Sequence, residues 1–186
     1  MGKIKIVERK FGEVLLIEPT VFSDERGFFM ETYNAKEMAE IGIKDVFLQD
    51  NQSHSMGGVV RGLHFQRQPH PTSKLVRCIK GEILDIVVDL RAMSPTFKQW
   101  SGFNLSENNK KSLYVPFGFA HGFCVVSAEA DVAYKTSEYF YKDYDAGIRW
   151  NDPEIGVEWP QKDPIVSSRD SQLPLLREIF KVNGGL

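Results

Sequence analysis

Long apolar stretches are missing from this sequence. No window approaches the ~20 consecutive apolar residues that a transmembrane helix requires. The first ten residues, Met1–Lys10, alternate basic and apolar side chains and lack the apolar segment of a signal peptide. We therefore expect a cytoplasmic protein that does not associate with membranes.

Cysteine and a dominant charge are also lacking. The two cysteines, Cys78 and Cys124, lie inside apolar runs, which predicts two buried thiols rather than a disulfide or a reactive pair. Lys and Arg number 23 against 25 Asp and Glu, so the net charge is −2. No general positive field favours nucleic acid. An anionic ligand must therefore be bound by a few locally placed Arg and Lys side chains.

Aromatic and turn-forming residues are plentiful, with 13 Phe, 6 Tyr, 15 Gly and 9 Pro in 186 residues. No repeat or linker interrupts the chain, so we expect one domain spanning residues 1–186. Short strand-like runs separated by turn signals predict an all-β jelly-roll sandwich or barrel with one or two short helices, which can hold a ligand between its sheets. The runs are Glu13–Pro19, Gly27–Tyr33, Asp45–Ser53, Val59–Phe65, Lys74–Lys80, Glu82–Leu90, Lys98–Leu105, Ser112–Val115, Phe123–Ser127 and Asp131–Tyr141.

Two of these runs, Lys74–Lys80 and Glu82–Leu90, are predicted to form a hairpin through Gly81. Alternation within the second run places the even-numbered apolar residues from Leu84 to Leu90 on one face. The other face carries Asp85 and Asp89 together with Ile83 and Val87.

Helices are expected in two places. Asn34 is suited to cap a short helix that ends at Gly42. The tail, Ser171–Phe180, has helical composition that Pro174 interrupts.

The four histidines are His54, His64, His70 and His121, and a histidine in a strand is more often structural than catalytic. His64 differs because a cation, Arg61, and a glycine, Gly62, precede it closely. Strict alternation would place Arg61 and His64 on opposite faces of the strand. They line one cavity only if the strand bulges, and Gly62 is the residue that permits a bulge.

A metal site is the first alternative for these histidines. The run Pro116–His121 resembles the second metal motif of the cupins. The first cupin motif is incomplete, because Phe65 and Gln66 follow His64 and no glutamate occurs before Glu82. Two ligands remain where zinc or iron usually has three from the protein. The resemblance therefore supports the barrel and predicts no metal.

Other polar positions have a structural and a functional interpretation. Arg26 precedes an aromatic pair, Phe28 and Phe29, and could contact a ligand, whereas neighbouring Asp24 and Glu25 suit a solvated turn. Gln49 and Asn51 share one strand face, which is either exposed or turned to sugar hydroxyls and phosphate oxygens.

Tyr134 shares a strand face with Thr136 and Glu138, and tyrosine in a strand usually packs in the core. Ser167–Asp170 is either a surface loop or part of a site.

Several motifs together resemble one family, the dTDP-4-dehydrorhamnose 3,5-epimerases. The similarity runs from about Val14 to Asp170 in the family's order. It includes VRGLHFQ, which begins at Val60, and VPFGFAHGF, which begins at Val115. The remaining segments are Phe22–Phe29, Gln49–Asn51, Lys74–Cys78, Tyr134–Thr136, Gly147–Asp152 and Ser168–Asp170. The resemblance implies a homodimer with a cupin-like jelly roll that uses neither cofactor nor metal.

The resemblance also implies a role for individual residues. His64 matches the general base, Asp170 the carboxylate that orients it, Tyr134 the general acid, and Lys74 the cation beside the C4 oxygen. Positions that hold the nucleotide sugar are matched by Arg26, Glu31, Gln49, Asn51, Arg61, Lys74, His121, Asp145 and Arg169. Asp145 and Arg169 depart from the glutamate and lysine that are frequent in the family. The segment Tyr139–Tyr144 is more aromatic than is usual in the family. Contacts to thymine or between subunits are therefore expected to differ from the family's.

The implied reaction inverts C3 and C5 of dTDP-4-dehydro-6-deoxy-D-glucose through enolates and forms dTDP-4-dehydro-L-rhamnose for dTDP-L-rhamnose biosynthesis. The implied chemistry needs a neutral base near pH 7, an acid on the other sugar face and a cation for the enolate oxygen. Two alternatives stay open: an epimerase that inverts a single centre of a dTDP-4-keto-deoxysugar, and a catalytically silent cupin that binds a sugar or a metal.

Overall fold

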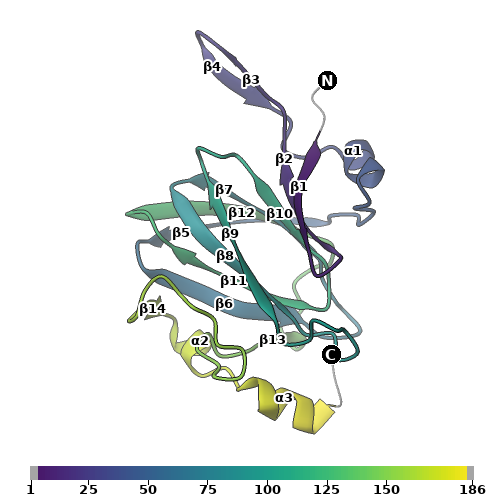
Figure 1. Cartoon of the computed structure of the whole chain (residues 1–186), viewed down its shortest axis with the longest axis vertical. Helices are drawn as coiled ribbons and strands as arrows, with labels where there is room; N and C mark the ends of the chain where they lie inside the picture. The colour runs from purple at the N-terminus through teal and green to yellow at the C-terminus, as the bar shows by residue number, and fades with distance from the viewer. Residues whose placement is uncertain (1–3, 184–186) are drawn as a thin grey trace.

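Two sheets facing each other form the body of the protein in the computed structural model, which describes residues 4–183 (Figure 1). The first sheet has the order β1 (Lys5–Lys10), β2 (Val14–Glu18), β10 (Ser112–Val115), β7 (Lys74–Lys80), β12 (Glu129–Thr136) and β5 (Gln49–Met56). The second has the order β13 (Asp145–Gly147), β6 (Val59–Gln66), β11 (Phe119–Val125), β8 (Glu82–Asp89) and β9 (Trp100–Ser106), with β14 (Ile165–Val166) parallel to β6. This arrangement confirms the all-β jelly-roll prediction.

The main core lies between the sheets, and a second core lies outside β6, β8 and β11. In β8, Ile83 and Val87 face the inter-sheet core, whereas Ile86 and Val88 pack beneath the C-terminal segment with Leu176. The predicted alternation of β8 is therefore confirmed. Because both faces of this strand are covered, its apolar residues from Ile86 to Val88 are removed from water and contribute to the hydrophobic stabilisation. Cys78 and Cys124 are buried and free, as expected.

Three short helices complete the fold: α1 (Ala35–Glu40), α2 (Ser168–Ser171) and α3 (Leu176–Asn183). The Asn34 side chain caps α1, accepting from the backbone N–H groups of Lys36 at 3.2 Å and Glu37 at 3.4 Å. The tail forms α2 and α3 on either side of Pro174, rather than one interrupted helix. Within residues 4–183, no helix is long and apolar enough to cross a membrane.

The hairpin expected at Gly81 is wrong. β7 pairs with β10 and β12, whereas β8 pairs with β9 and β11, so the chain passes from one sheet to the other at Gly81. Gly81 has a φ of +74°, and a Cβ there would lie 2.1 Å from the Glu129 carbonyl oxygen. Glycine is needed for this close crossing rather than for a hairpin turn.

Strand boundaries differ from the expectation in several places. β11 begins at Phe119 instead of Phe123, because the Pro116–Gly118 turn leads directly into it. β12 ends at Thr136 instead of Tyr141, and a loop carries the remaining aromatic residues. Strands β1, β3, β13 and β14 were not expected from the sequence, since three of them have few apolar residues and β14 has only two residues in all.

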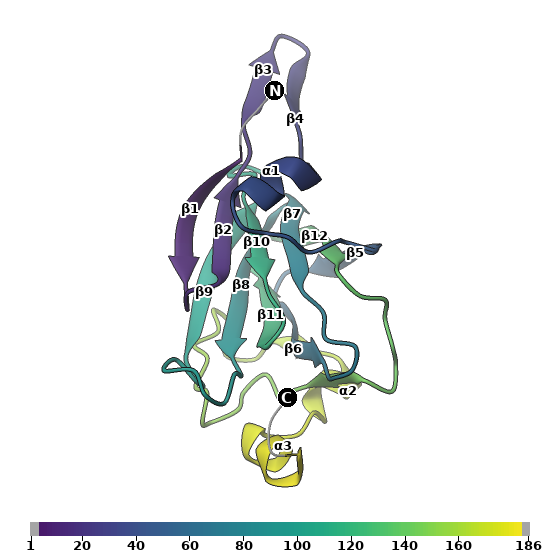
Figure 2. The same cartoon turned by 90° about the vertical axis from the view of Figure 1, so that its right-hand side faces the viewer.

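A separate hairpin, β3 (Val21–Asp24) and β4 (Gly27–Met30), extends from the body at the end opposite α3 (Figures 1 and 2). It carries three exposed phenylalanines, Phe22, Phe28 and Phe29, whose exposed fractions are 49%, 56% and 66%. These three rings make the hairpin an exposed apolar patch.

Candidate active site

A bulge in β6 directs Arg61 and His64 into one cavity between the sheets. The register of β6 against β11 shifts between these two residues, so that two residues of β6 face one of β11. Gly62 makes the bulge possible with a φ of +145°, and a Cβ on it would lie 2.6 Å from the Cα of Gly122. The bulge expected from the sequence is therefore confirmed, and Arg61 and His64 line the same cavity.

His64 is oriented by Asp170, which helix α2 positions. The Nε2 atom of His64 lies 2.7 Å from Oδ1 of Asp170, and Oδ2 accepts from the backbone N–H of Gly62 at 3.2 Å. Burial acts to raise the pKa of Asp170, but the His64 and Gly62 hydrogen bonds and the charge of Arg169 outweigh it and lower the pKa. An ionised Asp170 keeps the proton on Nε2. Nδ1 of His64 therefore holds the free lone pair.

The N-cap of α2 explains why Asp170 is in place. Ser167 Oγ accepts from the backbone N–H of Asp170 at 3.0 Å, which fixes the first turn of the helix. This role of Ser167 was not predicted from the sequence. The signal that could have found it is the spacing of a serine three residues before an acidic residue.

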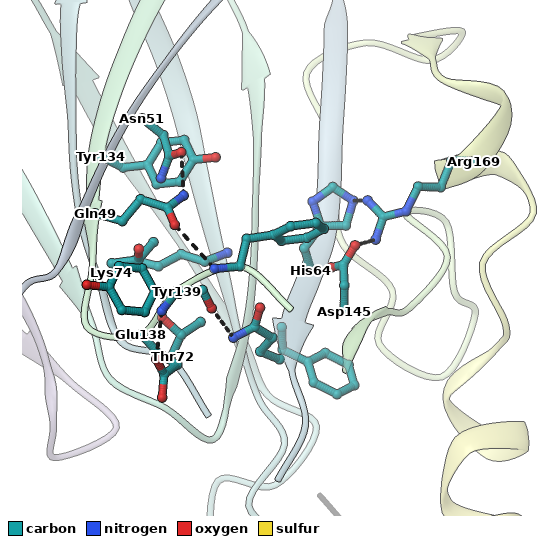
Figure 3. Close-up of a pocket in the computed structure, with 14 residues that line it drawn as sticks. Gln49, Asn51, His64, Thr72, Lys74, Tyr134, Glu138, Tyr139, Asp145 and Arg169 are labelled. Carbon is teal, nitrogen blue, oxygen red and sulfur yellow. Dashed lines mark hydrogen bonds and ion pairs between the residues drawn. The ribbon is translucent and has the colours of Figure 1, made fainter. Parts of the chain in front are cut away.

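Tyr134 and Lys74 face His64 from the other sheet. Tyr134 lies in β12 and Lys74 begins β7, and both line the cavity that His64 lines from β6 (Figure 3). Burial raises the pKa of Tyr134, so its hydroxyl keeps its proton. Burial also lowers the pKa of Lys74 to about 8, against the opposing effect of nearby Asp85 and Asp145. Lys74 is therefore mostly a cation at neutral pH.

His121 and Asp85 form a buried pair beside these groups. The His121 Nε2 atom lies 2.9 Å from Oδ1 of Asp85, and His121 lines the cavity. Burial lowers the pKa of His121, although Asp85 acts in the opposite direction. A neutral imidazole therefore borders the cavity. Asp85 was expected on the same strand face as Ile83 and Val87, but its pairing with His121 was not predicted.

Polar side chains line the cavity on both sides of these groups. Arg61 is held by Ser55 Oγ at 2.9 Å and the His54 carbonyl at 3.1 Å. Gln49 donates to Oδ1 of Asn51 at 2.8 Å, and both residues line the cavity as expected (Figure 3). Ser53 and Thr136, which were not assigned to the site from the sequence, also line it. Their hydroxyl oxygens are buried and have no hydrogen-bond partner among the described residues.

Asp145 and Arg169 reach the site as an ion pair. The Nη2 atom of Arg169 contacts Oδ2 of Asp145, and its Nη1 atom lies 3.5 Å from Nε2 of His64 (Figure 3). Both residues line the cavity. The same Nη1 atom lies 3.9 Å from Oδ1 of Asp170, so the Arg169 guanidinium places its positive charge between the carboxylates of Asp145 and Asp170.

Two of the expected substrate contacts do not reach the cavity of their own chain. Arg26 lies at the tip of the β3–β4 hairpin, where its side chain is 83% exposed and pairs with Asp24 at 2.5 Å. Glu31 follows β4 and accepts from the side chain of Asn34 at 3.4 Å. Neither residue lines the cavity that contains His64. Within residues 4–183, no group of three or more His, Cys, Asp or Glu is placed to hold a metal ion.

The fold and this geometry together define a class of protein. It is a cupin-like jelly roll whose cavity places a carboxylate-oriented histidine on one wall and a tyrosine and a lysine on the other. More narrowly, the chain belongs to the dTDP-4-dehydrorhamnose 3,5-epimerase family, whose model matches residues 8–178.

Individual relatives agree with this assignment. The chain is 49% identical over 168 residues to the dTDP-4-dehydrorhamnose 3,5-epimerase of Shigella flexneri, covering 90% of this chain and 93% of the relative. It is similar to the structure of the Bacillus anthracis enzyme of that name with TDP and PPi bound, with a TM-score of 0.92, 48% identity, and coverage of 93% of this chain and 99% of that one. The dTDP-6-deoxy-D-glucose-3,5-epimerase of Legionella pneumophila, in complex with dTDP-4-keto-L-rhamnose, has a TM-score of 0.91 and 44% identity over 95% of this chain and 94% of that one.

Proposed function

We propose that this protein is a dTDP-4-dehydrorhamnose 3,5-epimerase, an isomerase that inverts C3 and C5 of dTDP-4-dehydro-6-deoxy-D-glucose and forms dTDP-4-dehydro-L-rhamnose. The product serves dTDP-L-rhamnose biosynthesis. The observation that carries the proposal is the position of His64 and Tyr134 on opposite walls of one cavity. Inversion at carbon requires a base on one face of the sugar and an acid on the other, and this cavity provides both.

His64 removes the proton in this mechanism. A hydrogen at C3 or C5 is acidic because it lies next to the C4 carbonyl. Nδ1 of His64 accepts it, and the positive charge that forms on the imidazole is stabilised by Asp170 at 2.7 Å from Nε2. General-base catalysis of this kind contributes typically ~10²–10⁴-fold.

Lys74 stabilises the enolate. Loss of the proton places negative charge on the C4 oxygen, and the Lys74 ammonium group is a buried cation that lines the same cavity. A cation held in place inside a poorly hydrated cavity stabilises such a charge more than it would in water. We therefore propose that the reaction uses this side chain in place of a metal or an organic cofactor.

Tyr134 returns a proton to the opposite face. Because burial raises the pKa of Tyr134, the hydroxyl is protonated at neutral pH and can donate to the basic enolate carbon. Each inversion requires the same three groups.

The rest of the cavity suits a nucleotide diphosphate. Arg61, held in place by Ser55, can form charge-assisted hydrogen bonds with phosphate oxygens. Gln49 and Asn51 offer amide groups to the sugar or the base, and the aromatic rings of Tyr139 and Phe140 line the same region. These contacts explain how a chain of net charge −2 binds an anion.

A homodimer in the cytoplasm follows from the same proposal. We assign Arg26 and Glu31 to binding of the nucleotide sugar, yet neither lines the cavity of its own chain, and the β3–β4 hairpin extends away from the body of the protein (Figure 2). They can act only at the cavity of a second copy. Packing against that copy would also cover Phe28 and Phe29.

Incubation with the dTDP-4-keto sugar in heavy water tests the proposal. Deuterium is expected at both C3 and C5, and the proton NMR spectrum of the product is expected to show the L-rhamno configuration. Activity is expected to survive exhaustive chelation. Deuterium at one carbon alone would establish an epimerase for a single centre. No exchange at either carbon would establish a binding protein and contradict the proposal.

A further inference from the structure

One wall of the cavity is a loop rather than a strand. Residues 137–144 connect β12 to β13, and within this loop Tyr139 and Phe140 line the cavity with exposed fractions of 53% and 59%. Rings with this exposure are not fixed by burial in the core. Their position depends on what holds the loop.

The loop is attached along its length to the segment 66–73. At one end, the backbone N–H of Ser73 donates to Ser137 Oγ at 2.8 Å. In the middle, Gln66 accepts from the backbone N–H of Tyr141 at 2.9 Å. Near the other end, the backbone N–H of Arg67 donates to the Tyr144 carbonyl at 2.9 Å. These hydrogen bonds determine the path of the loop backbone.

Three rings connect the two segments between these hydrogen bonds, and we call them the aromatic clamp: His70, Tyr141 and Tyr144. The imidazole of His70 stacks on Tyr141 with ring centroids 3.7 Å apart and an interplanar angle of 18°. Tyr144 meets His70 edge-on at 4.9 Å. Stacked and edge-on ring pairs of this kind are attractive beyond the area they bury.

The segment that provides His70 is itself rigid. Proline stands on both sides of His70, which restricts the backbone dihedral angles there, and the His70 carbonyl accepts from Gln66 Nε2 at 2.8 Å. The carboxylate of Glu138 lies 3.6 Å from Nδ1 of His70, and the Arg67 side chain donates to the Asp143 carbonyl at 2.9 Å. The clamp therefore holds the loop against a segment whose backbone is constrained.

None of the three clamp rings lines the cavity with His64, although Glu138, Tyr139 and Phe140 do. We propose that the aromatic clamp is a positioning device that holds Tyr139 and Phe140 in place for the planar base of the substrate, so that His70 determines nucleotide affinity without touching the nucleotide. This inference rests on the proposed function. If the clamp is lost, the loop adopts other positions as well. The apparent affinity for the nucleotide then falls in proportion to the fraction of molecules whose loop is in the binding position.

Replacement of His70 tests the clamp through binding and turnover measured separately. His70→Ala is expected to raise the Kd for dTDP, measured by titration calorimetry, and the KM for the dTDP-sugar about 5- to 10-fold. The kcat is expected to stay within about twofold, because the groups around His64 are untouched. His70→Phe keeps a stacking ring and is expected to restore most of the affinity. Lys5→Ala, which removes an exposed side chain that pairs with Glu18 on the edge strand β1, is the control and should change neither constant.

Three results would overturn the positioning role of the aromatic clamp. Wild-type affinity for dTDP in His70→Ala overturns the clamp, as does a fall in kcat at unchanged KM. Equal losses in His70→Ala and His70→Phe also overturn it, because the ring would then not be the active feature. If His70→Ala fails to fold, Tyr144→Leu replaces it with the same expected rise in Kd. A wild-type protein that binds no dTDP would refute the proposed function instead.

Discussion

Asp170 fixes the tautomer of His64 and stabilises the positive charge that forms on its imidazole in the proposed reaction. His64→Ala removes the base, and deuterium exchange at C3 and C5 is expected to fall by ~10²–10⁴-fold. Asp170→Asn leaves the imidazole but removes the charge 2.7 Å from Nε2, so a smaller loss is expected. Exchange is measured by mass spectrometry in heavy water. Near-normal exchange in His64→Ala, with dTDP binding intact, would contradict the assignment of the base.

Tyr134 can be tested by separating exchange from inversion. Tyr134→Phe removes only the hydroxyl and keeps the ring, which packs against the inter-sheet core. His64 can still take a proton and return it to the same face, so exchange should continue. Net inversion is expected to fall by ~10²-fold or more relative to exchange. If both fall together by the same small factor, Tyr134 is not the acid.

We expect Lys74 to determine the alkaline limit of activity. Because burial lowers its pKa to about 8, the cation is lost as the pH rises through that value. The kcat/KM is therefore expected to decline above about pH 8, and a profile measured between pH 6 and about 10 checks this. A profile that stays flat to the alkaline end would contradict the role of Lys74 as the oxyanion partner.

The same pKa shift affects stability with a definite sign. Between about 8 and the ordinary lysine value of 10.5, the unfolded chain binds a proton that the folded chain does not, so stability rises with pH in this window. Lys74→Met removes the buried charge. This variant is expected to be more stable by roughly 1–3 kcal/mol at neutral pH and to lose activity.

At the scale of elements, the bulge in β6 connects the fold to the chemistry. Gly62→Ala places a Cβ 2.6 Å from the Cα of Gly122, and this backbone contact cannot be relieved by a side-chain rotation. We expect a loss of ~1–3 kcal/mol in the free energy of unfolding and lower activity, because Arg61 and His64 no longer share one cavity.

Gly12→Ala is the matched control for this element. Gly12 also has a positive φ, +80°, but nothing lies within 4 Å of its Cβ position. The free energy of unfolding of both variants is measured with denaturant. The comparison separates the cost of a positive φ, which occurs at both positions, from the contact with Gly122, which occurs only at Gly62. Equal destabilisation of the two would show that the bulge tolerates a side chain.

The patterns that predicted elements correctly were local. Asn34 caps α1 and the alternation of β8 sorts its residues between two cores, because hydrogen bonds to the next turn and side-chain direction depend on near neighbours in the chain. The error at Gly81 has the opposite origin. Alternation defines the two faces of β7 and β8, but it does not specify which strands pair at their edges.

At the scale of the whole molecule, the hairpin provides a test of the dimer. If Arg26 serves the partner's cavity, Arg26→Ala and His64→Ala are each inactive alone, but a mixed dimer contains one complete site. After subunit exchange of equal amounts, activity is expected to recover to about a quarter of the wild-type value. Sedimentation checks that dimers form. No recovery, with mixed dimers present, would place Arg26 at the cavity of its own chain.

The sequence by itself determined the all-β class, the short helix after Asn34, the buried thiols and the grouping of His64, Arg61 and Gly62 around a bulge. Each depends on composition, on the two-residue period of a strand or on the conformational freedom of glycine, all of which act over a few neighbouring residues.

Only the tertiary structure decided that Tyr134 faces His64, that Asp85 pairs with His121, that Arg169 bridges to Asp145, and that Arg26 points away from its own cavity. The physical reason is common to all four. These residues are far apart in the chain or belong to different sheets, and their separation in space depends on how two sheets twist, pack and close. That geometry arises from the sum of many weak contacts across the core, so no short stretch of sequence contains it.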